Sequence, residues 1–334
     1  MESRGEFVIV GPGKLWYVGW MLPTKNGSIR LFRFAGIDVF LHWSWFIVAL
    51  FPMQYLGKSY PSLVWNALVY VALFGIVLLH EFGHALACRQ VGGRAEQIVL
   101  WPLGGVAYVA PPQRPGATLW SIAAGPLVNV ALAPVLAIAS VLANSVAPSG
   151  SNVTTLLFHI TLINAGIFCF NMLPIYPLDG GQILRSILWF FLGRAKSLFV
   201  AVIIGFVGIG ALVLVAIASY VLHWGAFGPL LPFVAVFMFL NCWSGLMQAR
   251  ILAKIDKLPR REGFACPVCK QRPIIGRFWV CHKCRSRFDT FQTQATCPVC
   301  AEQFPVTHCL DCGEAHPLEQ WATAPAQPPV LGQH

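Results

Sequence analysis

Two long stretches without a charged residue constrain this chain more than any other feature. No Asp, Glu, Lys or Arg occurs from Pro115 to Leu178 or from Ser197 to Ala249. Over the whole chain 57% of the residues are hydrophobic and only 11% are charged, whereas soluble domains have about 25% charged residues. A helix needs about 20 apolar residues to cross a bilayer. The composition therefore predicts an integral membrane protein with several spans.

The apolar segments predict a mainly α, polytopic bundle of about six membrane helices. These spans are residues 38–57, 63–90, 117–147, 153–173, 197–223 and 228–250. The segment after Asp179 is short and carries charges at both ends. We therefore expect it to form a short helix near the membrane interface.

Lys and Arg are concentrated in alternate loops. They precede the first span, flank the second and fourth loops, and follow the last span, whereas residues 58–62, 148–152 and 223–228 contain only Lys58. Cytosolic loops carry an excess of Lys and Arg. The pattern predicts that both termini are cytosolic, and a bacterial-type plasma membrane is the expected location.

Composition also divides the chain into five regions. They are a cytosolic or interfacial segment (1–37), a membrane core (38–250), a basic linker (251–265), a cysteine module (266–320) and a disordered tail (321–334).

The sequence His80-Glu81-Phe82-Gly83-His84 lies near the end of the second predicted span. On a helix, residues four apart share a face, so His80 and His84 can bind one metal ion together. Glu81 is then placed to take a proton from a water molecule that the metal activates. A glutamate at membrane depth is costly and usually functional, which favours a catalytic metal site over incidental interfacial histidines.

A catalytic zinc site uses three protein ligands and keeps one position open. After Pro115 the next carboxylate is Asp179, at the end of the stretch NMLPIYPLD. The predicted topology places Asp179 and the two histidines at the cytosolic ends of their spans. Asp179 is therefore the candidate third ligand, although an ordinary helix-terminus aspartate is the alternative.

Three motifs in this order resemble the site-2 protease family of intramembrane metalloproteases. They are HExxH, then Gly125-Pro-Leu-Val-Asn129, then Asn171-Met-Leu-Pro-Ile-Tyr-Pro-Leu-Asp-Gly-Gly181, and the similarity covers about residues 36–185. The segment from Gly36 to Trp45 resembles a branch of the family that opens with a short strand before its first span. Members of that branch often carry a nucleotide-sensing domain where this chain has cysteine pairs.

The resemblance implies a role for each site residue. His80, His84 and Asp179 would bind the catalytic zinc, Glu81 would be the catalytic base, and Asn129 would face the site and help to hold the substrate. Asn129 is also a polar residue in an apolar span and needs a partner. A purely structural hydrogen bond between helices is therefore an open alternative.

The substrate of such an enzyme would be a membrane protein that unwinds locally before cleavage. Residues 97–109 are rich in strand-forming residues around a Pro-Leu-Gly-Gly turn. We expect a β-hairpin that pairs with the unwound substrate as an added strand. A loop that rests on the membrane lipid, with no substrate role, is the alternative.

Four CxxC pairs predict two structural zinc sites in the C-terminal module. In sequence order they form one set of Cys266, Cys269, Cys281 and Cys284, and a second set of Cys297, Cys300, Cys309 and Cys312. Two CxxC turns can close one tetrahedral zinc site, and a cytosolic location argues against disulfides. Whether the pairs combine sequentially or in another order stays open.

The first half of this module is basic and the second half is acidic. Six Lys and Arg residues and no acid occur from Cys266 to Phe288, and four acids and no Lys or Arg occur from Thr296 to Gln320. We expect contact with a protein or a membrane surface, with nucleic acid as the alternative.

The main prediction is therefore a zinc metalloendopeptidase with one catalytic and two structural zinc ions. A catalytically silent membrane scaffold that presents zinc ribbons is the rival reading. A di-iron desaturase would need several histidine clusters, and a metal transporter would need ligands repeated along several spans. The sequence has neither pattern.

Overall fold

The structure is a computed structural model that describes residues 27–46, 62–101, 104–148, 150–222 and 230–323. The chain divides into two compact units. One comprises residues 18–111 and 115–250, and the other consists mainly of residues 251–334. Each unit is described by itself.

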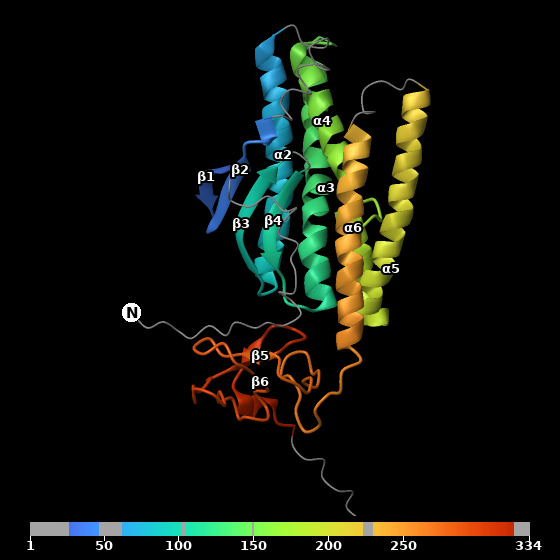
Figure 1. The fold of residues 1–334 in the computed structure, drawn as a ribbon. Helices are drawn as coiled ribbons and strands as arrows, with labels where there is room; N and C mark the ends of the chain where they lie inside the picture. Colours follow the sequence, from blue (N-terminus) through green and yellow to red (C-terminus); the bar gives the residue numbers. More distant parts are fainter. Residues whose placement is uncertain (1–26, 47–61, 102–103, 149, 223–229, 324–334) are drawn as a thin grey trace, which may run out of the picture. The chain divides into compact units, whose positions relative to one another are not determined.

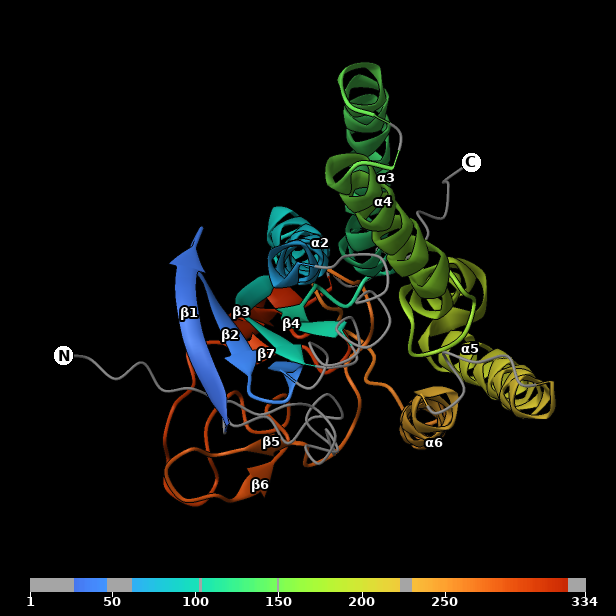
Figure 2. The ribbon, with the colours of Figure 1, turned by 90° about the horizontal axis from the view of Figure 1, so that it is seen from above.

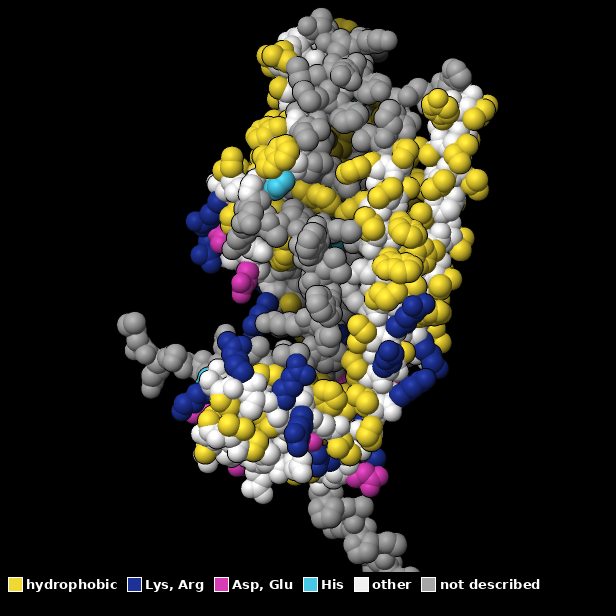
Figure 3. All heavy atoms as spheres, in the orientation of Figure 1, with side chains coloured by type: hydrophobic (Ala, Val, Ile, Leu, Met, Phe, Trp, Pro, Cys, Tyr) yellow, Lys and Arg dark blue, Asp and Glu magenta, His cyan; other side chains and the backbone are white. Residues whose placement is uncertain are grey.

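Five helices of the first unit are long and apolar enough to cross a membrane (Figure 1). They are α2 (Leu63–Gln90), α3 (Pro115–Val146), α4 (Asn152–Asn171), α5 (Asp179–Val221) and α6 (Leu230–Ile255). Apolar side chains cover much of the outward surface of α5 and α6 (Figure 3). The predicted spans at 63–90, 117–147, 153–173 and 228–250 are confirmed to within five residues at each end.

Helix α5 differs from its prediction, because the expected interfacial helix and the expected span 197–223 form one element that breaks at Gly193. This residue has φ 77° and ψ 174°, which is not helical. Positions 181 and 208 would lie about 40 Å apart on a straight helix. A Cβ on either residue would nevertheless lie within 2.5 Å of Ile175. The two parts of α5 therefore fold back on each other at Gly193.

A four-stranded sheet packs beside α2 (Figure 2). Its strands are β1 (Ser28–Phe34), β2 (Ile37–His42), β3 (Arg94–Trp101) and β4 (Gly104–Ala110), in the order β1-β2-β3-β4. Strands β2 and β3 run parallel and the other two pairs are antiparallel. The expected hairpin around residues 97–109 is confirmed as β3 and β4.

The predicted start of the first span at residue 38 is wrong, because residues 38–42 belong to β2. Ile37 and Val39 are fully buried while the residues between and after them are only partly buried. This alternation has the period of a strand. Residues 47–57 of that predicted span lie outside the described residues.

The second unit contains two short hairpins around an aromatic core. The strands are β5 (Trp279–Val280), β6 (Arg287–Phe288), β7 (Thr307–His308) and β8 (Ala315–His316), followed by the short 3-10 helix η2 (Leu318–Trp321). Trp279, Phe288, Phe291 and Trp321 belong to one buried cluster. Since Trp321 is only 1% exposed, we propose that the module extends past the predicted boundary at 320, to at least Thr323.

Candidate active site and metal centres

His80 and His84 lie one helical turn apart on α2 and are both buried, at 3% and 6% exposure. His80 donates from Nδ1 to the side-chain oxygen of Asn129 at 2.7 Å, and His84 donates from Nδ1 to the carbonyl oxygen of Ser121 at 2.9 Å. A neutral histidine that donates from Nδ1 has its lone pair on Nε2. Both Nε2 atoms are therefore free to bind a metal.

The N-terminal residue of α5 completes the cluster. Oδ2 of Asp179 lies 3.0 Å from Nε2 of His80 and 3.4 Å from Nε2 of His84, and the two Nε2 atoms are 3.1 Å apart. Two lone pairs and a carboxylate oxygen thus converge on one point in a buried place. This set of donor atoms is suited to binding a cation.

Zinc fits these three donors. Zinc bonds to nitrogen and oxygen of about 2.0 to 2.1 Å in a tetrahedral site place neighbouring ligand atoms about 3.3 Å apart. The three distances observed here, 3.0, 3.1 and 3.4 Å, bracket that value. Three ligands also leave the fourth tetrahedral position for water or substrate.

Glu81 follows the first histidine and faces the edge strand of the sheet. Its carboxylate accepts a hydrogen bond from the backbone N–H of Ala107 on β4, at 3.0 Å, and the residue is 7% exposed. Gly105 allows this approach, because a Cβ there would lie 2.2 Å from the Glu81 side chain. The sheet therefore holds the carboxylate beside the histidines.

Asn129 lies next to the candidate zinc site but is engaged at both ends of its side chain. Its oxygen accepts from His80, and its Nδ2 donates to the side-chain oxygen of Asn164 on α4 at 2.8 Å. Asn164 in turn donates to the backbone carbonyl of Asn129 at 3.0 Å. Substrate binding by Asn129 stays a prediction, and the structure adds a second use, which is to orient His80.

Sequence reasoning missed Asn164 and the carbonyl of Ser121. Asn164 carries the same signal as Asn129, a polar side chain inside an apolar span that needs a partner. No sequence signal marks a backbone carbonyl as the partner of a histidine.

The Asn164→Ala variant is expected to weaken zinc binding at the membrane site about tenfold, because residues that orient metal ligands typically contribute 10- to 100-fold in affinity. The measurement is zinc retained per chain during competition with a chelator. Asn241→Ala is the matched control, since the hydrogen bond that the Asn241 side chain makes among the described residues goes to Phe237 of its own helix, α6. Equal zinc affinity in the two variants would contradict the role of Asn164.

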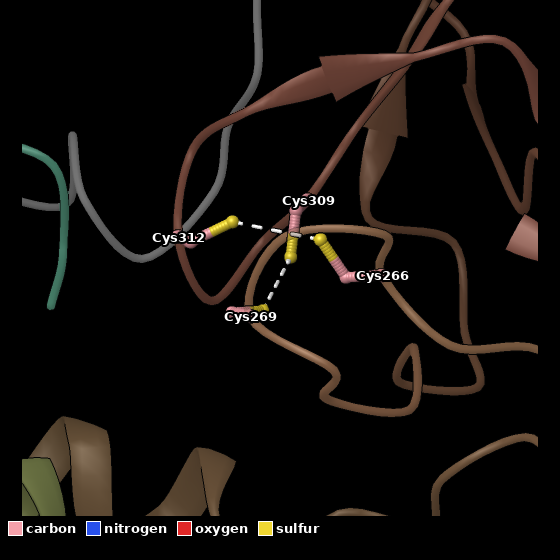
Figure 4. Close-up of side chains that lie close together, drawn as sticks. All are labelled: Cys266, Cys269, Cys309 and Cys312. Carbon is pink, nitrogen blue, oxygen red and sulfur yellow. Dashed lines mark hydrogen bonds between the residues drawn. The ribbon is translucent and has the colours of Figure 1, made fainter. Parts of the chain in front are cut away.

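The eight cysteines of the second unit form two clusters. Figure 4 shows the first, in which Cys266, Cys269, Cys309 and Cys312 point toward one another. Their closest sulfur atoms are 3.6 Å apart. The second cluster joins Cys281, Cys284, Cys297 and Cys300, with sulfur distances of 3.5 Å. These distances are far longer than a disulfide bond of about 2.05 Å and close to the edge of about 3.8 Å in a four-thiolate zinc site.

The two clusters are nested along the sequence: the first CxxC pair joins the fourth, and the second pair joins the third. The sequence left the combination open, and the sequential sets are not the ones that the structure brings together.

Each CxxC pair adopts the same turn. The residue after each second cysteine has positive φ, with values of 61° at Lys270, 61° at Arg285, 56° at Ala301 and 81° at Gly313. The N–H of that residue donates to the carbonyl of the first cysteine in all four turns, at 2.9 to 3.0 Å. Left-handed backbone is costly for residues other than glycine and persists where the surroundings enforce it. A metal bound by the two sulfurs would provide such enforcement.

Hydrogen bonds favour the thiolate form of Cys297, a member of the second cluster. Burial alone would raise the pKa of Cys297, but the Ser286 hydroxyl and the backbone N–H groups of Val299 and Cys300 lower this pKa to about 6. A thiolate is the form that binds zinc.

Zinc stoichiometry of double variants tests the nested pairing. Replacing Cys269 and Cys312 by Ala removes ligands from one site only, so this variant is expected to lose one zinc ion. Replacing Cys269 and Cys284 removes a ligand from each site and is expected to release two, because a four-thiolate site has no spare ligand. Metal analysis of the purified full chain decides, and sequential pairing predicts the reverse order.

The first unit combines membrane-length helices with an HExxH cluster, and this combination is typical of membrane-embedded metallopeptidases. The sequence profile of peptidase family M50 matches residues 68–150 and 141–217. The membrane region of this chain is therefore similar to that family, the site-2 protease family.

Several known proteins are similar to this chain. Zinc metalloprotease MJ0392 of Methanocaldococcus jannaschii is 38% identical over 180 residues, which are 54% of this chain and 51% of that protein. Stage IV sporulation protein FB of Bacillus subtilis is 37% identical over 119 residues, which are 34% of this chain and 38% of that protein. A solved structure, the site-2 protease from Methanocaldococcus jannaschii, is 29% identical, with a TM-score of 0.47, and covers 66% of this chain and 95% of its own.

The chain spans about half the length of the curated relatives it matches. The profile match ends at residue 217, before the cysteine module begins.

Proposed function

We propose that this chain is a zinc metalloendopeptidase that hydrolyses a peptide bond in or near a transmembrane segment of a membrane protein. One observation carries the proposal: three donor atoms, from the buried His80 and His84 and the partly buried Asp179, converge at zinc-binding distances beside the carboxylate of Glu81. A structural zinc site would be closed by a fourth protein ligand. Among the described residues, the cluster contains only these three.

In this mechanism, zinc supplies Lewis-acid activation of water and of the scissile carbonyl group. Glu81 accepts a proton from the attacking water at one carboxylate oxygen and delivers a proton to the nitrogen of the leaving amine. The backbone N–H of Ala107 donates a 3.0 Å hydrogen bond to the carboxylate of Glu81 and holds this carboxylate in place during the proton transfers. Asn129 and the Ser121 carbonyl keep both histidines in the tautomer that binds metal.

Strand β4 is the proposed docking edge for the substrate. It is the last strand in the order β1-β2-β3-β4, and the N–H of Ala107 points away from β3 toward Glu81. An unwound substrate that adds to this edge would pass beside the catalytic carboxylate. A photo-reactive residue at Val109 should then crosslink to the substrate near the cleaved bond. Crosslinks found only from lipid-facing positions such as Val135 would contradict strand addition.

The proposed enzyme has a defined number of zinc ions and a defined orientation in the membrane. We infer one catalytic zinc ion and two structural zinc ions in the nested cysteine clusters. Both termini are assigned to the cytosol of a cell with a bacterial-type plasma membrane, because Lys and Arg flank the alternate loops. The module's thiolates require such a reducing compartment. Modification of introduced surface cysteines near residue 320 from outside intact cells would overturn this orientation.

The basic half of the module presents the proposed surface for a protein or membrane partner. Its exposed cations are Lys270, Arg272, Arg277, Arg285 and Arg287. Lys283 is exposed as well and pairs with Glu302 at 3.2 Å, which links the basic half to the acidic half, and Arg272 pairs with Glu262 at 3.7 Å. Nucleic acid is the competing partner. Reversing the charge of these cations tests the two partners: a strong loss of binding to anionic vesicles, but not to RNA, would favour the membrane.

The experiment that tests the proposed activity compares the membrane proteomes of cells that produce the wild-type chain or Glu81→Gln. Accumulation of uncut single-span proteins only in the variant would support proteolysis and identify the substrates. Identical proteomes from folded, zinc-loaded proteins would favour the silent scaffold.

A further inference from the structure

Residues 172–178 form the loop that leads into Asp179. This loop packs against Gly205 and Gly208 on α5 and Gly245 on α6, which together are called the glycine socket. Its residues Ile175 and Tyr176 pack against the second part of α5 and against α6. A Cβ on Gly208 would lie 2.4 Å from Ile175, and a Cβ on Gly245 would lie 2.9 Å from the Tyr176 ring. Real carbon atoms do not approach so closely. The loop can occupy this place only because both positions lack a side chain.

A hydrogen bond from α6 fixes the same loop. The thiol of Cys242 donates to the backbone carbonyl of Tyr176 at 2.9 Å. Gly205 lies beside this contact, because a Cβ there would be 2.7 Å from the Cys242 sulfur and 3.2 Å from the Tyr176 carbonyl oxygen. The carbonyl of a loop in an apolar region needs such a partner.

The first turn of α5 presses on the loop from another direction. A Cβ on Gly181 would lie 2.5 Å from the backbone of Ile175, and a Cβ on Gly180 would lie 2.4 Å from the carbonyl oxygen of Met172. Asp179 directly precedes these two glycines, so the loop and the proposed zinc ligand are packed tightly together. The fold-back at Gly193 brings Gly208 to the same unit.

We propose that Ile175 and Tyr176 are positioning residues of the zinc site, and that the glycine socket on α5 and α6 sets the position of Asp179 relative to the histidines. Tyr176 lies only three residues before Asp179, and three residues of chain span at most about 10 Å. A displaced loop therefore moves the carboxylate, whose oxygen lies 3.0 Å from His80. This inference rests on the proposed zinc site but not on the proposed proteolysis.

Two alanine substitutions on one helix test the socket. Gly208→Ala introduces a methyl group against Ile175, whereas Gly210→Ala introduces one where nothing lies within 4 Å. Both changes raise helix propensity, so propensity does not separate them. We expect Gly208→Ala to bind zinc at the membrane site about 10- to 100-fold more weakly, as for other residues that orient ligands, and Gly210→Ala to match the wild type.

The readout is the zinc that the full chain retains during competition with a chelator, without any substrate. The zinc lost in His84→Ala defines the membrane site, and the zinc retained in the cysteine module shows that each variant is folded there. Wild-type zinc affinity in Gly208→Ala would overturn the proposal.

A second variant separates positioning from general damage. Ile175→Ala removes the atoms that the new methyl group meets. In that background, Gly208→Ala should cost no further zinc affinity, because the effect passes through Ile175. If Gly208→Ala lowers zinc affinity equally with and without Ile175, the proposed role of the glycine socket is contradicted. If the wild-type chain binds no more zinc than His84→Ala, the zinc site itself fails. If it binds zinc but cuts no protein, only the proposed proteolysis fails.

Discussion

The Glu81→Gln variant is expected to hydrolyse its substrate about 10²- to 10⁴-fold more slowly than the wild type, which is the usual contribution of a general acid–base group. Glutamine has the size of glutamate, and its side-chain oxygen can still accept the N–H of Ala107, which now bonds to Glu81 at 3.0 Å. It cannot take a proton from water. Rates are measured with the purified full chain in detergent on a substrate identified from the proteome comparison.

Two controls make this result specific. Glu96→Gln changes an exposed glutamate on β3 and should cut at the wild-type rate. The zinc content of Glu81→Gln should equal that of the wild type, because Glu81 is not among the three clustered ligands. Cleavage by Glu81→Gln at close to the wild-type rate would remove Glu81 from the mechanism.

The Gly125→Ala variant is expected to lose the membrane zinc and all measurable cleavage. Gly125 lies on α3 opposite the histidines, and a Cβ there would be 2.3 Å from Nε2 of His84 and 2.9 Å from Nε2 of His80. These are the atoms proposed to bind zinc, so the methyl group would compete with the ion for its place. The buried methyl group should also destabilise the fold by about 1 to 3 kcal/mol, as overpacking usually does.

Gly166→Ala is the matched control for this change, because a Cβ at that position on α4 meets nothing within 4 Å. Metal analysis and thermal unfolding of both variants separate loss of zinc from loss of fold. A zinc-loaded, active Gly125→Ala would show that the ion lies elsewhere.

Local spacing in the sequence was enough to find the parts of the site that lie on one helix. His80, Glu81 and His84 share one turn of α2, so helical periodicity alone places them together. Asp179 required one more step, the topology deduced from Lys and Arg. The structure brings its carboxylate within 3.4 Å of both histidines.

Contacts between distant segments could not be predicted in the same way. The nested pairing of the cysteines depends on how two hairpins pack in the module, and any combination of four CxxC turns satisfies zinc. The clearance provided by Gly125 and Gly208 depends on helix packing, which no residue spacing reveals. The early start of the first predicted span had another cause, since Val39 to Leu41 are apolar and lead into that span, whereas Ile37 to His42 form a strand.

Zinc removal and return is the most direct test of the central claim, that His80, His84 and Asp179 hold a zinc ion that serves proteolysis. The full chain is treated with a chelator until the zinc of the membrane site is lost, and cleavage is followed as zinc is added back. Cleavage should stop on removal and return with about one equivalent of zinc, and His84→Ala should recover none. Cleavage that continues in the stripped chain, or that returns in His84→Ala, would contradict the claim.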